Sequence, residues 1–488
     1  MGPTTPIAAP GDSAGASQVP IGTVRQPTLA DPGWVTGITL GELYTDNLKL
    51  SASGKPKESS WITQIQPFVK AAYNGPHFSG LVDYSLTGYL YSGHSSYNQL
   101  TQDLKAQGTL TVVSQHLFVD GTAVYGSEVI NNRLASAPGT YFLTNNRANV
   151  ARGTVSPYWI QGLGNAATMM LRYSHGRVVY NTRGITGENR GVLSGISNAN
   201  SNALQFSLVS PKDRTWGWNL QYSNQRIKSD YATTSLDYGV AKLGTYVEVS
   251  DSARLLADAG KESQFLPDGT IQKLGAKFWD AGFAWANGLN QFKALVGHRF
   301  FGRSYKFSWV RTASLLTTAI HYVEQPTDIN QQLLGQNPGQ LIASPIGLSG
   351  LPSLTERQPY LMKRGTVSVS YQLPRGRLEL SAYQERRTYF TTGLTSRPEK
   401  VTNANAHWLF EIGAFTTLTP TVGWQRYRYQ DGQFFRNTYE ELALVHQYSP
   451  DDFASLKLRH DSRTVSTVFT AGNGYLVNVI FLQWTHLF

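Results

Sequence analysis

Apolar and polar residues alternate with a period of two from Trp34 to the C terminus, in segments of roughly 10 to 16 residues. The segment 216–223, for example, reads WGWNLQYS, with a large apolar side chain at every second position. Successive side chains of a β-strand point to opposite faces, so this pattern predicts strands with one apolar face and one small, polar face. Helical periodicity is nearly absent, and the fold class is therefore expected to be all-β.

The connections between these segments alternate between short and long. Turn-forming sequences such as Asn74-Gly75-Pro76, Asn287-Gly288 and Pro374-Arg375-Gly376 follow every second segment, and longer polar stretches such as 182–198 and 326–362 follow the others. Short turns at one end and long loops at the other are typical of outer-membrane barrels, in which the turns are periplasmic. We therefore predict a single large antiparallel transmembrane β-barrel of about 22 strands (range roughly 18–24), with no plug domain and with both termini periplasmic.

The wide lumen of such a barrel would be open to water unless loops fold into it. The loop 326–362 is the longest and carries few charges. It either folds inward as a constriction or lies on the surface, and both alternatives stay open.

The last fourteen residues, Tyr475 to Phe488, have the pattern of one strand that ends on an aromatic residue. Both faces are largely apolar, as expected of a barrel-closing strand whose outer side faces lipid. We expect it to pair with the first strand, near 34–46, because an open edge is not tolerated in lipid. One face resembles the signal by which bacterial outer-membrane barrels are recognised for insertion, and it carries Ile480, Leu482, Trp484, His486 and Phe488.

Composition supports a membrane barrel. Charged residues are 15% of the chain, below the roughly 25% of soluble domains, while aromatic residues reach 12% and mean hydropathy is −0.28. No stretch approaches the roughly 18 apolar residues that a membrane helix needs, which excludes a helical membrane protein. Cysteine is absent, which excludes disulfides and thiolate chemistry.

Residues 1–33 are rich in Pro, Gly, Ala, Ser and Thr and are expected to form a disordered periplasmic tail, leaving 34–488 as the barrel. The start lacks the basic and apolar regions of a secretory signal, so we interpret the chain as a mature form with an added start residue.

The sequence carries no catalytic or metal-binding motif, so we expect neither an enzyme nor a cofactor. The net charge of +10 allows anionic partners, but the basic residues are scattered singly, and nucleic acid is not expected. Some basic residues fall in the inward phase. They form either an anion-selective lining or ion pairs with residues such as Asp83, Asp280 and Asp461, and these inward candidates for a substrate path are Arg172, Lys293, Arg299, Lys306, Lys457 and Arg459.

Three segments, 44–47 (YTDN), 60–63 (SWIT) with Pro67, and 297–302 (GHRFFG) followed by Tyr305, resemble an uncharacterised Gram-negative outer-membrane family associated with PEP-CTERM/exosortase and exopolysaccharide systems. The resemblance implies a porin-like conduit for exopolysaccharide export. The expected partners are membrane lipid, lipopolysaccharide, the polysaccharide chain, the barrel-insertion machinery and a periplasmic export protein. A general diffusion porin or small-solute channel and a structural surface barrel are the alternatives.

Overall fold

The computed structural model describes residues 27–181, 196–211, 215–230, 235–265, 274–334, 353–354, 356, 358–390, 397–466 and 474–488. Twenty-two strands of 10 to 17 residues make up almost all of the regular structure in this part of the chain. The elements are β1 (Gly33–Thr45), β2 (Ser60–Asn74), β3 (Phe78–Tyr91), η1 (Ser95–Tyr97), β4 (Gln99–Val113), β5 (Leu117–Val129), β6 (Arg147–Leu163), β7 (Ala167–Asn181), β8 (Ala199–Val209), β9 (Trp216–Ser229), β10 (Leu236–Ser250), β11 (Ala253–Phe265), β12 (Leu274–Ala286), β13 (Asn290–Arg299), β14 (Gly302–Thr312), β15 (Leu316–Thr327), α2 (Ile329–Leu334), β16 (Tyr360–Leu373), β17 (Gly376–Tyr389), β18 (Glu399–Gly413), β19 (Thr416–Arg428), β20 (Phe434–Gln447), β21 (Asp452–Val465) and β22 (Tyr475–Leu487).

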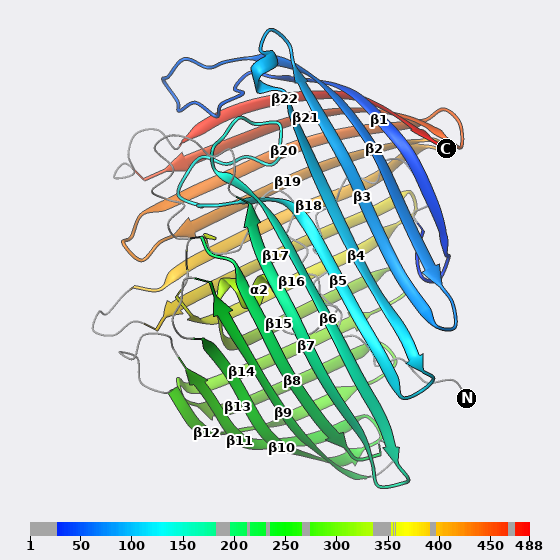
Figure 1. The fold of residues 1–488 in the computed structure, drawn as a ribbon, viewed down its shortest axis with the longest axis vertical. Helices are drawn as coiled ribbons and strands as arrows, with labels where there is room; N and C mark the ends of the chain where they lie inside the picture. Colours follow the sequence, from blue (N-terminus) through cyan, green and yellow to red (C-terminus); the bar gives the residue numbers. More distant parts are fainter. Residues whose placement is uncertain are drawn as a thin grey trace.

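Each strand pairs antiparallel with the next one in sequence, and β22 closes the sheet on β1 (Figure 1). The closing register runs from Gly37 opposite Leu487 to Thr45 opposite Val479. The seam includes a buried hydrogen bond between the hydroxyls of Thr39 and Thr485, 2.8 Å apart. The predictions of an all-β, closed, 22-stranded antiparallel barrel and of its closure by the first and last strands are confirmed.

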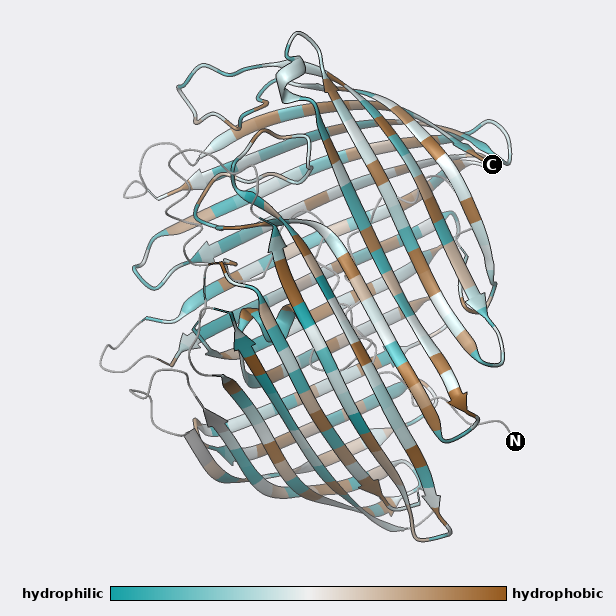
Figure 2. Cartoon of the chain, in the orientation of Figure 1, coloured by the Kyte–Doolittle hydropathy of each residue, from teal (hydrophilic) through white to brown (hydrophobic). Residues whose placement is uncertain are grey.

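Hydropathy alternates along nearly every strand (Figure 2). On β22, Leu482 and Ile480 are 59% and 44% exposed, whereas Val479 and Val477 on the opposite face are buried. The exposed apolar side chains point outward, where lipid rather than water removes the cost of leaving them uncovered. This arrangement makes the chain an integral outer-membrane barrel.

Ten connections at one end of the barrel are short, and the opposite end carries the longer ones. The free ends of β1 and β22 lie at the short-turn end, where the Phe488 amide donates to the Thr36 carbonyl. One tight turn breaks the pattern at the long-loop end, between Arg299 and Gly302, and Gly302 adopts the positive φ of 101° that a side chain would strain. In the described ranges, no helix is long and apolar enough to cross a bilayer.

The predicted tail, residues 1–33, falls mostly outside the described residues, which begin at 27.

Candidate functional site: a lumen occupied by two inward segments

The connection between β5 and β6 (residues 130–146, here the β5–β6 loop) folds against the inner wall of the barrel. Its Tyr141 is 4% exposed, and its ring lies 5.4 Å from that of Phe481 and 6.1 Å from that of Tyr89. The hydroxyl of Tyr91 donates to the Tyr141 carbonyl at 2.6 Å. The loop thus covers the inward faces of β22 and β3.

This packing explains why the inward face of the last strand is apolar. Val477, Val479 and Phe481 would be costly on the wall of a water-filled pore, but here they form one buried cluster with Ala137, Tyr141 and Phe142 of the loop. The sequence did carry a signal for this contact, since apolar residues occupy both faces of 475–488.

The second inward element is the segment 328–334, here the α2 segment, which contains α2. Asp328 caps the helix by accepting the amide N–H groups of Asn330 and Gln331, at 2.7 and 3.2 Å. The same carboxylate accepts the hydroxyl of Tyr238 on β10 at 2.7 Å. Asp328 is 1% exposed, and its burial raises the pKa of the carboxyl above the ordinary 3.8.

The α2 segment starts at the end of β15 and extends across the lumen to strands on the other side of the barrel. Ile329, Leu333 and Leu334 pack in one buried cluster with the inward residues Val150 of β6 and Val178 of β7. Polar side chains add contacts to two more strands, because Gln331 donates to Gln225 of β9 and Gln332 to Tyr360 of β16, and Asn330 adds a second contact to β7 by accepting from Tyr180. Of the two alternatives for the loop 326–362, the described residues follow the inward one (Figure 1).

Residues 353–354, which follow the α2 segment in the same loop, connect it to the β5–β6 loop, because Ile130 and Leu354 lie in the same buried cluster as Ile329, Leu333 and Leu334. The Leu354 amide donates to the Ile130 carbonyl at 2.8 Å, and the Asn132 amide donates to the Ser353 hydroxyl at 3.1 Å. The β5–β6 loop is also held from the far wall, since Arg463 of β21 donates to the Asn132 carbonyl at 2.6 Å. The lumen is therefore bridged from β15 to β6 and β7, and from β5 to β21.

A cavity of about 450 Å³ lies between the α2 segment and the inner wall. Its lining combines apolar surface with many side-chain amides and hydroxyls, and the polar lining residues include Gln205, Gln221, Gln225, Tyr238, Lys242 and Gln331. Two buried polar atoms of lining residues, Oε1 of Gln331 and Nε of Arg299, have no hydrogen-bond partner among the described residues. Since buried polar groups are almost always hydrogen-bonded, these two atoms are available to water or to a ligand in the cavity.

The predicted inward basic residues do face inward, and five of the six are paired with acids. Arg172 lies 2.6 Å from Asp120; Arg299 lies 3.1 and 3.2 Å from Glu262 and Asp280; Lys306 lies 3.7 Å from Asp280; Lys457 lies 3.9 Å from Glu441; Arg459 lies 2.7 and 3.2 Å from Asp461 and Glu441. Lys293 is exposed and has no ion pair within the described residues. Whether any of the six contacts a transported ligand stays a prediction, as does the role of Ile480, Leu482, Trp484, His486 and Phe488 as an insertion signal.

A buried ionic cluster on β16–β19 was not foreseen. Arg387 and Glu385 are fully buried on the inner face, where they pair with each other, and Arg364 donates to the second oxygen of Glu385 at 2.6 Å. Arg387 also donates to the Tyr427 hydroxyl at 2.7 Å. Buried charges are tolerated only when paired and hydrogen-bonded in this way. The alternation of 383–389 places Glu385 and Arg387 on the inner face, but it does not identify Arg364 and Tyr427 as their partners, because these lie on other strands.

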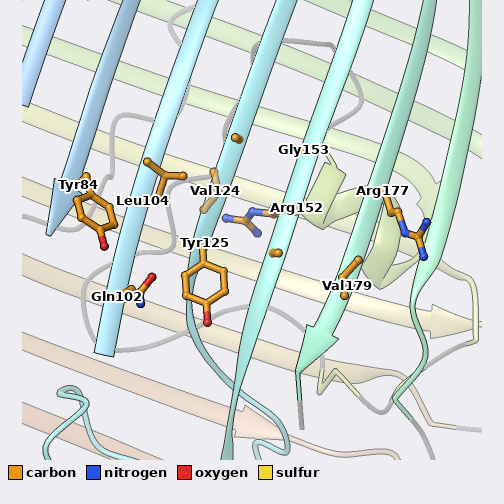
Figure 3. Close-up of a pocket in the computed structure, with 11 residues that line it drawn as sticks. Tyr84, Gln102, Leu104, Val124, Tyr125, Arg152, Gly153, Arg177 and Val179 are labelled. Carbon is orange, nitrogen blue, oxygen red and sulfur yellow. The ribbon is translucent and has the colours of Figure 1, made fainter. Parts of the chain in front are cut away.

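A hollow on the outside of the barrel faces lipid instead of the lumen. It is nearly all apolar and lies over β3–β7, where Ala123, Ala151 and Gly153 leave room beside Tyr84 and Tyr125 (Figure 3). Acyl chains would fill such a depression, so we do not assign it to a transported ligand.

No protein-family model matches the sequence, and no curated protein matches it. Among solved structures, the FrpB iron transporter from Neisseria meningitidis is similar with a TM-score of 0.50 and 8% identity, covering 93% of this chain and 82% of that chain. A mutant of the ferric enterobactin receptor PfeA from Pseudomonas aeruginosa has a TM-score of 0.48 and 9% identity, with coverages of 95% and 81%. The siderophore receptor PirA from Acinetobacter baumannii has a TM-score of 0.48 and 7% identity, with coverages of 93% and 80%. Identities this low establish a shared barrel fold only, so membership of the PEP-CTERM-associated family stays a prediction.

The prediction of an exopolysaccharide conduit is wrong. The fold matched at a TM-score of 0.50 is that of a protein named for iron transport. The physical reason lies in the lumen, where the chain's own segments occupy the space that a polymer needs and where acids neutralise five of the six basic residues meant to guide it. The polysaccharide chain and the periplasmic export protein are therefore no longer expected as partners. The alternatives of a general diffusion porin and a structural surface barrel are not supported either.

Proposed function

We propose that this chain is a gated outer-membrane transporter that takes up a small polar ligand. The ligand binds in the cavity beside α2, and the α2 segment must move for it to pass. The long-loop end faces the cell exterior, while the short turns and both termini face the periplasm. In this proposal the inward segments occupy the lumen and close it; the absence of a plug domain stays a prediction.

The observation that carries the proposal is that Gln331 belongs both to the lining of the cavity and to the segment that closes the lumen. It lines the cavity, and it also ties the closing segment to Gln225 on β9. A ligand can shift a conformational equilibrium only by binding the two conformations differently. An occupant that accepts a hydrogen bond from Nε2 of Gln331 competes with Gln225 for that donor, and so weakens a contact that keeps the α2 segment docked, which couples binding to opening.

The cavity chemistry indicates what kind of ligand fits. Lys242 is paired with Asp258 at 3.3 Å, and Arg299 is paired with Glu262 and Asp280, so the lining presents hydrogen-bonding groups with little unpaired charge. A ligand with several hydroxyl, amide or carbonyl groups and low net charge suits this surface.

A single-thiol reporter tests the proposal, because the chain contains no cysteine. In proteoliposomes, Gln331→Cys should react slowly with a maleimide, and an occupying ligand should change the rate. Lys293→Cys, on an exposed part of the lumen wall, should react fast in all conditions. The suitable probe is sucrose, a neutral ligand rich in hydroxyls.

Planar-bilayer recordings supply the second readout. The wild-type barrel should show only small, intermittent currents, since the inward segments block the lumen. A large, constant conductance together with equal labelling of the two cysteine variants would show an open pore and refute the proposal.

A further inference from the structure

Five exposed basic side chains gather on the outward face of β17–β20, close to the long-loop end. They are Arg386 on β17, Lys400 on β18, Arg426 and Arg428 on β19, and Arg436 on β20. Their chain neighbours, such as Arg387, Val401, Tyr427 and Phe435, are buried on the inner face, so the alternation of the strands turns these five toward the membrane side. We call them the outer basic patch.

The strand register places these cations directly opposite one another. Arg386 faces Lys400, and Lys400 faces Arg428, which puts three positive charges in one row across three strands. In the next outward row, Arg426 faces Arg436. Neighbouring strands are about 4.8 Å apart, and like charges at directly opposed positions destabilise a sheet. The free barrel therefore bears an electrostatic cost at this patch.

No carboxylate in the described part of the chain relieves this cost. None of the five has an ion pair within the described residues, in contrast to the basic residues of the lumen. The remaining partners in the two rows are uncharged, apart from Lys363 on β16, which continues the first row and is neutralised by Glu324 at 3.1 Å. The nearest outward carboxylate on β17–β20, Glu440, lies four residues from Arg436, about 13 Å along the strand.

The surface on the membrane side of the patch is apolar. Leu380, Trp408, Val422 and Leu442 are between 39% and 51% exposed on the same outward face, farther from the long-loop end. The patch itself lies within the last or first few residues of its strands, at the level where a barrel leaves the hydrocarbon for the headgroup region. A partner that covers both the basic patch and the apolar surface needs an anionic headgroup attached to an apolar portion.

We propose that the outer basic patch binds the phosphorylated headgroup of an outer-leaflet lipid, with its acyl chains lying over the apolar surface. Arginine forms bidentate, charge-assisted hydrogen bonds with phosphate, and one phosphate between two opposed cations turns their repulsion into attraction. A head with two phosphates matches two rows of cations. This site does not depend on the proposed transport function.

Two double variants of equal charge change test the site. Lys400→Gln/Arg428→Gln removes one opposed pair from the patch. Arg177→Gln/Lys228→Gln removes two outward cations from the same end of the barrel whose shared cross-strand neighbour is the neutral Asn200. Binding of diphosphoryl lipid A to the detergent-purified barrel is measured by native mass spectrometry and by the shift in thermal unfolding midpoint.

The patch variant should bind lipid A roughly 25-fold more weakly, about fivefold for each of the two cations removed, and the control should bind like wild type. Without lipid, the patch variant should melt at the same or a higher temperature than wild type, because a repulsive pair is gone. Equal affinity of both variants for lipid A would overturn the proposal.

Experiments on the wild-type barrel test the proposed lipid site even if a variant does not fold. Lipid A stripped of phosphate should not raise the melting temperature, and added salt should weaken the binding of intact lipid A. If the stripped lipid binds as well, the phosphates are not recognised. If inorganic phosphate stabilises the barrel as much as lipid A does, the patch is a site for free anions and the lipid assignment is wrong.

Discussion

At the scale of single residues, period-two alternation fixes which side of the wall a side chain occupies but not what it meets there. The inward direction of Arg172 and Arg459 could be predicted because it follows from their place in a strand. Their partners could not, since Asp120 lies on β5, two strands away from Arg172 on β7, and only the register brings them together. For Asp328 even the direction of the side chain could not be predicted, because it lies outside the strands and precedes a helix of six residues, which is too short to show a period.

Asp328 is also the residue whose replacement best tests the docking of the α2 segment. Asp328→Ala leaves the Tyr238 hydroxyl and two helix N–H groups without their acceptor, which should weaken docking by about 1–3 kcal/mol and increase bilayer currents. Asp328→Asn can still cap the helix and should stay closed. Unchanged currents in the alanine variant would mean that this contact does not hold the segment.

The raised pKa of Asp328 gives this contact a pH dependence. The docked segment binds the proton more tightly than the released one, so docking is strongest below the ordinary pKa of 3.8 and weakens as pH rises through the raised pKa. Currents of the wild type should therefore fall on acidification across this window. The asparagine variant lacks the titrating group, and its currents should respond less to pH; an equal response would assign the effect to another group.

At the scale of elements, strand number and closure could be predicted because both follow from local pattern and from the intolerance of lipid for open edges. The inward packing of the β5–β6 loop could not, since it depends on the match between Tyr141 and an inner surface built from β1, β2, β3 and β22. Only the apolar inner face of β22 pointed to a covering element. What would cover it was not readable from the sequence.

Adjacent positions on β22 provide a test of the two faces of one strand. Leu482→Arg places a charge in lipid and should destabilise the barrel by about 2–4 kcal/mol near the bilayer midplane. Gln483→Arg, one residue on, points into the lumen beside Gln64 and should be tolerated. Urea unfolding in lipid vesicles, followed by the heat-modifiable band on gels, measures the difference. Equal losses for both variants would contradict the assigned faces.

At the scale of the whole molecule, the β5–β6 loop and the α2 segment act as one closure because both contact Leu354, which follows the α2 segment and shares a buried cluster with it and with Ile130. A backbone hydrogen bond holds Ile130 and Leu354 side by side, and no native cysteine interferes, so this pair is a candidate for an introduced disulfide. In an Ile130→Cys/Leu354→Cys variant, oxidation should lock the closure and lower bilayer currents by at least about tenfold, a rise of ~1.4 kcal/mol in the free energy of opening. Reduction should restore wild-type behaviour, and each single cysteine variant should behave like wild type throughout. If the oxidised, cross-linked protein conducts as the reduced protein does, solutes pass through the barrel without separating these segments, and gating must lie elsewhere in the lumen.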